Sequence, residues 1–233
     1  YEYVLGPSMT YTCAVFPTED ATLEEAQETK YDLVARKLDL QEGQRLLDLG
    51  CGWGGMVRHA AKEYGVNVIG VTLSREQASW AQHRIKEEGL DHLAEVRFMD
   101  YRHVEESGFD AVSSIGLTEH IGLKNYPSYF TWVRDHLKPQ GRLLNHCITR
   151  NDNTQAASAG AFIDRYVFPD GELAGSGTIV TAVEDCGLEV QHQENIRVHY
   201  AKTLAGWCRN LQENWDACIE EVGVGTAKVW GLY

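Results

Sequence analysis

The chain has 233 residues, of which 43% are hydrophobic and 24% charged, and its formal net charge is −13. This length suits one α/β domain with a full core, and this composition is that of a globular protein. The acidic balance argues against a nucleic-acid partner and against strong electrostatic docking on anionic membranes, because both need a basic face. No stretch approaches the roughly 18 apolar residues of a membrane span.

Helices and strands are predicted to alternate along the first 146 residues. Helices are expected over residues 22–38, 54–64, 74–88 and 126–137, and strands over 45–49, 67–71, 94–99, 109–115 and 142–146. Thr22 and Glu25 open the first helix with a capping-box pattern. Strands that alternate with helices at this spacing predict a mostly parallel sheet with helices on both faces.

The chain beyond residue 150 has a different pattern. Residues 151–177 are predicted to form a long polar loop, which is usually functional or mobile in a compact domain. A final helix is expected from about residue 201. Its apolar stripe is typical of core packing and contains Leu204, Trp207, Leu211, Trp215, Cys218 and Val222.

The cysteines show no metal-binding pattern. None forms a CxxC pair or stands in a Cys/His ligand spacing, and the six are Cys13, Cys51, Cys147, Cys186, Cys208 and Cys218. We therefore predict free thiols in a reducing cytoplasm and no metal site.

The ends of the predicted strands carry polar residues. Right-handed crossovers between parallel strands place the strand carboxyl ends along one edge, where ligands bind. Asp48, Thr72, Asp100, Ile115 and His146 end or follow the five strands. We expect these residues along that edge.

A glycine cluster follows the first strand. Gly50, Gly52 and Gly55 match G-x-G-x-x-G, a pattern typical of dinucleotide sites, with a purely structural turn as the alternative. An NAD site needs an acidic residue at the end of the second strand, where residues 71–74 read Val-Thr-Leu-Ser. Asp48 instead precedes the glycines, where it would repel a pyrophosphate and attract a cation. S-adenosylmethionine (SAM), with an adenosine body and a positive end, fits this pattern.

The glycine run 48–54 (DLGCGWG) resembles the first motif of SAM-dependent methyltransferases. Other segments are similar to one branch, the cyclopropane-fatty-acyl-phospholipid synthases and mycolic acid cyclopropane synthases: 9–16 (MTYTCAVF), 71–77 (VTLSREQ), 118–122 (TEHIG), 162–169 (FIDRYVFP) and 199–204 (HYAKTL). The resemblance implies a Rossmann-like SAM-dependent methyltransferase fold. The family normally begins further upstream and continues with another strand. The resemblance therefore implies that residues 1–233 are a single methyltransferase domain that lacks terminal segments.

The resemblance also assigns the cofactor contacts. Asp48, Gly50 and Gly52 would hold the methionine part of SAM, and Thr72, Leu73 and Gln77 would reach the ribose. Asp100 and Tyr101 would flank the adenine. Tyr11 and Thr12 would close over SAM from the N-terminal side. Two alternatives stay open. Gln77 also fits a capping box with Ser74, and Tyr101 fits a surface turn.

The chemistry implied by the family needs a base. An alkene is a poor nucleophile, so it must be held in line with the sulfonium methyl in a dry pocket. Methyl transfer leaves a carbocation, and ring closure removes a proton from the added methyl. The resemblance implies bicarbonate as that base, held by Cys13, Glu119, His146, Ile148 and Tyr200. A helix cap is the alternative for Glu119, and a structural strand-end histidine is the alternative for His146.

The predicted function is SAM-dependent C-methylation at the double bond of an unsaturated fatty acyl chain. We rank a cyclopropane product first and a methylene branch second. A small-amine N-methyltransferase and a SAM-binding protein without catalysis are the rivals, and neither needs the combined set around Glu119. The expected partner is a phospholipid acyl chain, with peripheral contact at the inner face of the membrane. Tyr166, Phe168 and Trp207 would line an acyl tunnel, with core packing as the alternative.

Overall fold

The protein is built on a five-stranded sheet. The computed structural model describes residues 1–154, 158, 160–169 and 171–233. The strand order is β3-β2-β1-β4-β5, and every neighbouring pair is parallel. The strands are β1 (Arg45–Leu49), β2 (Asn67–Thr72), β3 (Ala94–Phe98), β4 (Phe109–Ile115) and β5 (Leu137–His146). The predicted parallel α/β fold is confirmed.

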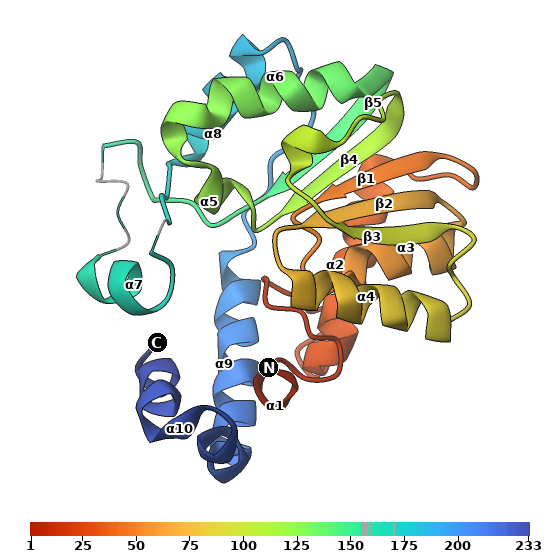
Figure 1. The fold of residues 1–233 in the computed structure, drawn as a ribbon. Coiled ribbons are helices and arrows are strands. Elements are labelled where there is room, and N and C mark those ends of the chain that lie inside the picture. The colour runs from red at the N-terminus through yellow and green to blue at the C-terminus, as the bar shows by residue number, and fades with distance from the viewer. Residues whose placement is uncertain (155–157, 159, 170) are drawn as a thin grey trace.

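Helices cover both faces of the sheet (Figure 1). One face packs on α2 (Leu23–Leu38), α3 (Gly55–Tyr64) and α4 (Arg75–Glu87), and the other on α6 (Tyr126–His136) and α8 (Ser176–Asp185). The shorter elements are α1 (Glu2–Leu5), α5 (Thr118–Ile121), α7 (Ala161–Tyr166), η1 (Tyr101–His103) and η2 (Leu123–Asn125). Two long helices, α9 (Arg197–Glu213) and α10 (Trp215–Leu232), lie below the sheet in Figure 1, where α1 packs on α9.

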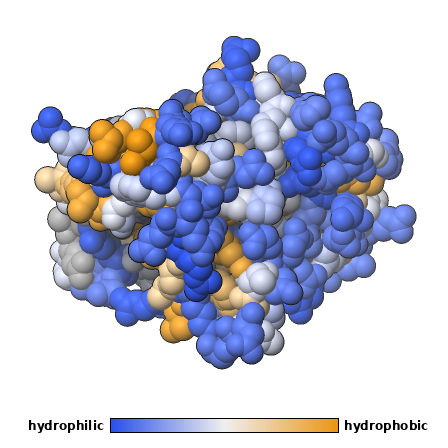
Figure 2. All heavy atoms as spheres, turned by 90° about the horizontal axis from the view of Figure 1, so that it is seen from below, coloured by the Kyte–Doolittle hydropathy of each residue, from blue (hydrophilic) through white to orange (hydrophobic). Residues whose placement is uncertain are grey.

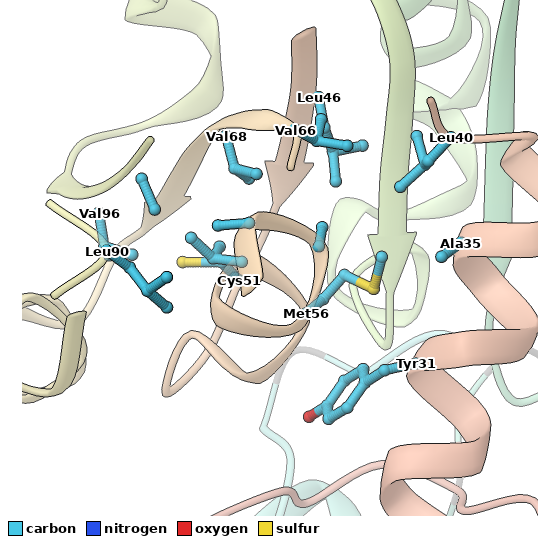
Figure 3. Packing of buried hydrophobic residues seen from close by; sticks show 14 of the residues in the cluster. Tyr31, Ala35, Leu40, Leu46, Cys51, Met56, Val66, Val68, Leu90 and Val96 are labelled. Atoms are coloured by element: carbon cyan, nitrogen blue, oxygen red, sulfur yellow. The ribbon is translucent and has the colours of Figure 1, made fainter. Parts of the chain in front are cut away.

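The central strand β1 divides its side chains between two cores. Successive residues of a strand point to opposite faces. Leu46 joins the cluster under α2, α3 and α4, together with Met56 and Val68 (Figure 3). Leu47 and Leu49 join the cluster under α6 and α8. The alternation places Asp48 on the Leu46 side, where only 2% of it is exposed.

The capping box predicted at the start of α2 is confirmed, and it gives a first testable prediction. Thr22 Oγ1 accepts from the Glu25 amide at 3.2 Å, and Glu25 accepts from the Thr22 amide at 2.8 Å. We expect Thr22→Ala to lower the free energy of unfolding by about 1 kcal/mol, because an amide at the helix start loses its partner. Urea unfolding measures this change, with Thr29→Ala within the same helix as a control. An unchanged midpoint for Thr22→Ala would show that the cap does not stabilise α2.

The structure corrects three predicted elements. Strand β5 begins at Leu137, and residues 138–141 form an irregular insertion before regular pairing resumes at Arg142. The loop predicted over 151–177 contains α7 and ends as α8 begins.

The prediction of a single final helix is wrong. The chain turns at Asn214 between α9 and α10, and α10 is itself interrupted at Gly223, whose φ is 78°. The predicted core stripe is split accordingly: Leu211 and Cys218 are buried, whereas Val222 is 51% exposed.

Candidate active site

The site lies where the strand order reverses, between the carboxyl ends of β1 and β4. In doubly wound sheets, ligands bind at this switch point. Gly50 and Gly52 follow β1 with φ values of 66° and 54°, a left-handed conformation that favours glycine. A Cβ on Gly50 would lie 3.1 Å from Leu117, and one on Gly52 would lie 3.2 Å from the Tyr11 ring. The turn is therefore covered closely by neighbouring chain.

A cavity at this turn is enclosed by three parts of the chain. The N-terminal segment 8–12 forms one wall, α2 contributes Lys30 and Tyr31, and the glycine turn and Ile115 complete the lining. Asp48 lines the same cavity. The structure thus brings together the predicted cofactor residues Tyr11, Thr12, Asp48, Gly50 and Gly52.

Asp48 is a buried acid with a hydroxyl partner. Ser113 Oγ on β4 donates to Asp48 Oδ1 at 2.6 Å. Burial raises the pKa of Asp48 to about 7, and the Ser113 bond and the charge of Lys30 oppose that rise. A cationic ligand beside Asp48 would favour its charged form.

Thr72 and Gln77 form a hydrogen-bonded group at the end of β2. Thr72 Oγ1 donates to Gln77 Oε1 at 2.7 Å, and Gln77 Nε2 donates to the Tyr11 hydroxyl at 3.3 Å. Ser74 Oγ accepts from the Gln77 amide at 3.2 Å and so caps α4. The backbone amide of Gln77 therefore serves the cap. Its side chain faces Thr72 and Tyr11 in the predicted cofactor region.

The predicted adenine residues are already engaged with protein. Asp100 caps η1 and forms an ion pair with Arg102 at 2.6 Å. The Tyr101 ring packs edge-on against Tyr129 and Trp132, with centroids 5.4 and 5.1 Å apart. Tyr101 is therefore half-buried on α6 and does not stand free on a surface turn. Leu73 is 72% exposed.

Glu119 is the centre of a second polar group. It lies in α5 just beyond β4, is 9% exposed, and its Oε1 accepts from the Ile148 amide at 2.8 Å. Its other oxygen, Oε2, is buried with no hydrogen-bond partner among the described residues. Burial raises the pKa of Glu119. An unpartnered buried carboxylate oxygen is costly and calls for a donor.

The other residues predicted to hold the base are Cys13, His146 at the end of β5 and Tyr200 on α9. Tyr200 on α9 lies close enough to Cys13 and Glu119 for their charges to affect it. Burial lowers the pKa of His146 to about 4 and raises the pKa of Cys13 to about 11. The pKa of Tyr200 is also raised by burial. The histidine, thiol and phenol are therefore uncharged at neutral pH, as suits a dry site.

Two polar residues of α2 belong to the site and were not predicted from the sequence. Gln27 is 0% exposed and Lys30 is 2% exposed, and both bond to Thr12. They fall on the same helix face as the buried Ala26 and Val34. The sequence signal that could have identified them is a polar residue at a position of the otherwise apolar stripe of α2.

These features define the class of protein. A parallel sheet with a glycine turn after β1, a buried acid and a polar group after β2 is the arrangement of a Rossmann-like SAM-dependent methyltransferase. Among solved structures, a mycolic acid cyclopropane synthase complexed with SAH and CTAB matches with a TM-score of 0.92 and 32% identity, over 100% of this chain and 85% of that chain. A cyclopropane synthase from Mycobacterium tuberculosis matches with a TM-score of 0.91 and 32% identity, over 99% of this chain and 84% of that chain.

The chain belongs to the mycolic acid cyclopropane synthetase family, whose model matches residues 1–233. A probable fatty acid methyltransferase of Mycobacterium tuberculosis is 65% identical over 100% of this chain and 54% of its own length. The cyclopropane-fatty-acyl-phospholipid synthase of Escherichia coli is 37% identical over 100% of this chain and 59% of its own length. The chain thus spans little more than half the length of these curated relatives.

Proposed function

We propose that the protein is a SAM-dependent C-methyltransferase that acts on the double bond of an unsaturated fatty acyl chain, with a cyclopropane as the first-ranked product. The observation that carries this proposal is the unpartnered Oε2 of Glu119, buried beside Ile148 and near Tyr200. An amine methyltransferase has no need of such a group away from the glycine turn. We also propose that residues 1–233 form one methyltransferase domain.

The residues around the glycine turn fit SAM. Asp48 presents a buried carboxylate to a cation, and the left-handed glycines let the backbone approach a ligand closely. Thr72 and Gln77 offer a hydroxyl and an amide to the ribose, and the segment at Tyr11 covers the site. Bound SAM would supply an electrophilic methyl group.

The residues around Glu119 fit bicarbonate. Glu119 Oε2 has no partner in the described part of the chain and is free to accept a hydrogen bond, so it can hold the hydroxyl of a bound bicarbonate in place. His146 is uncharged and lies at the end of β5, with a ring that can donate or accept. The role of Glu119 is to position the base while staying apart from the substrate cation. Ile148 in turn fixes the Glu119 carboxylate by its amide.

Aromatic rings continue from this group toward α9, α10 and α7. Tyr200 contacts Trp207 at 6.4 Å between centroids, and Phe168 contacts His120 at 5.5 Å and Tyr233 at 6.2 Å. Aromatic faces bind apolar chains and stabilise cations. These contacts support an acyl-chain site bordered by Phe168 and Trp207. Tyr166 is 51% exposed and lies further out.

A phospholipid substrate has to be reached at a membrane surface. No helix in the described ranges is long and apolar enough to cross a bilayer. The face seen from below is mostly hydrophilic with separate hydrophobic groups (Figure 2). We propose that the lipid is reached by peripheral contact at the cytoplasmic face.

The ribose assignment gives a second prediction. Gln77→Leu should weaken SAM binding by about 1 kcal/mol, because it removes a side-chain amide, the acceptor of the Thr72 hydroxyl and the donor to the Tyr11 hydroxyl. Titration calorimetry measures the change. Ser74→Ala is the matched control, since it should lower helix stability and leave SAM affinity nearly intact. Equal affinity losses in both variants would assign Gln77 to the cap alone.

Product analysis tests the proposed function. Purified protein is incubated with SAM and an oleoyl phospholipid, and the released acyl chains are analysed by gas chromatography–mass spectrometry and NMR. We expect cyclopropane proton signals. Vinylic methylene signals would support the methylene-branched alternative, and methylation of an added amine without change in the lipid would overturn the proposal.

A further inference from the structure

Lys30 is a buried lysine without an acidic partner. It is 2% exposed, and its Nζ donates to Thr12 Oγ1 at 2.9 Å and lies 4.1 Å from the Tyr31 ring centroid. Within the described chain, no carboxylate lies within 4.0 Å of this ammonium, whereas the other close lysine contacts with acids are all near the surface. Buried charges in proteins are normally paired or neutralised. An anion bound beside Lys30 would favour its charged form.

The position of Lys30 indicates where that partner binds. Lys30 and Asp48 line the same cavity beside Gly50 and Gly52, and among the described lining residues Lys30 is the only lysine or arginine. The cavity thus presents one buried acid and one buried base. Burial raises the pKa of Asp48 and lowers that of Lys30, and the charge of each opposes the shift of the other.

The methionine end of SAM carries both an ammonium and a carboxylate. We propose that Lys30 binds this carboxylate while Asp48 pairs with the ammonium, so that the two residues select the zwitterionic end of the cofactor. This inference rests on the proposed use of SAM and adds a residue to its binding site. Thr12, whose hydroxyl accepts from Lys30, lines the same cavity and would complete the carboxylate site.

A competing explanation is that Lys30 merely fastens the N-terminal segment. Gln27 offers the matched control, because it is equally buried on α2 and its Nε2 donates to the Thr12 carbonyl at 3.0 Å. Gln27→Leu removes a bond to the same residue without removing a charge. If fastening were the whole role of Lys30, both variants would affect every ligand alike.

The test compares two ligands on each variant. One is S-adenosylhomocysteine, which keeps both charged groups, and the other is its decarboxylated analogue, which keeps only the amine. Calorimetry should show that Lys30→Met weakens S-adenosylhomocysteine about 10- to 100-fold and the decarboxylated analogue by less than about threefold. Gln27→Leu should weaken both ligands by the same factor.

Other outcomes overturn the inference. Equal losses for both ligands in Lys30→Met would assign Lys30 a structural role, and so would an unchanged affinity for S-adenosylhomocysteine. If Lys30→Met does not fold, the same two affinities are measured for Lys30→Gln and for the wild-type protein. A wild-type protein that binds both ligands equally contradicts a carboxylate site. A wild-type protein that binds neither ligand would instead overturn the proposed function itself.

Discussion

Glu119→Gln is expected to lower turnover by about 100-fold or more and to leave SAM affinity within about threefold. The substitution keeps the size of the side chain and an oxygen for the Ile148 amide, but it replaces the buried acceptor Oε2 with a donor. Loss of a correctly placed base costs about two to four orders of magnitude in rate. A change confined to turnover marks an interaction made in the chemical step. Single-turnover rates and calorimetry on the same preparation separate the two quantities.

The control for Glu119 is a nearby carboxylate of similar geometry. Glu172 Oε2 accepts from the Leu123 amide at 2.7 Å, and Glu172→Gln should retain turnover. Added bicarbonate should partly restore Glu119→Gln if the anion site is only under-occupied. Full turnover of Glu119→Gln in bicarbonate-depleted buffer would show that Glu119 does not position the base.

Asp48→Asn is expected to weaken SAM binding by about 1.5–3 kcal/mol, the usual range for a hydrogen bond to a charged group. Asparagine keeps an oxygen for the Ser113 hydroxyl but offers no charge to the ammonium of SAM. The loss is measured by calorimetry near neutral pH. Asp110→Asn is the control, because Asp110 lies at the opposite end of β4 and bonds to Arg45 and Lys138. Unchanged SAM affinity in a folded Asp48→Asn protein would contradict the cofactor assignment.

The regular part of the fold was predictable because its signals are local. The five strands and the helices between them follow apolar runs with caps and glycine ends, and the structure has them in the expected sequence. The end of the chain was not predictable in the same way. Leu204 to Val222 keep a helical period through Asn214, so the pattern cannot show that the chain turns there.

The site, like the fold, was predictable only in part. The predicted cofactor residues could be identified because they stand at the ends of parallel strands. Those ends meet at one edge of the sheet, where ligands bind. The apolar stripe of α2 marks Gln27 and Lys30 as unusual, but their contacts with Thr12 depend on the N-terminal segment folding back over α2. Contacts between segments far apart in sequence, such as Ala14 with Thr203 of α9, likewise need the tertiary structure.

The most direct test of the account follows the transferred methyl group. The protein is incubated with SAM that carries a trideuterated methyl and with an unsaturated phospholipid, and the acyl chains are analysed by mass spectrometry. C-methylation followed by proton loss from the added methyl predicts an acyl product that retains two of the three deuterium atoms. An unlabelled acyl fraction, or label found with all three deuterium atoms on an amine, would contradict the account.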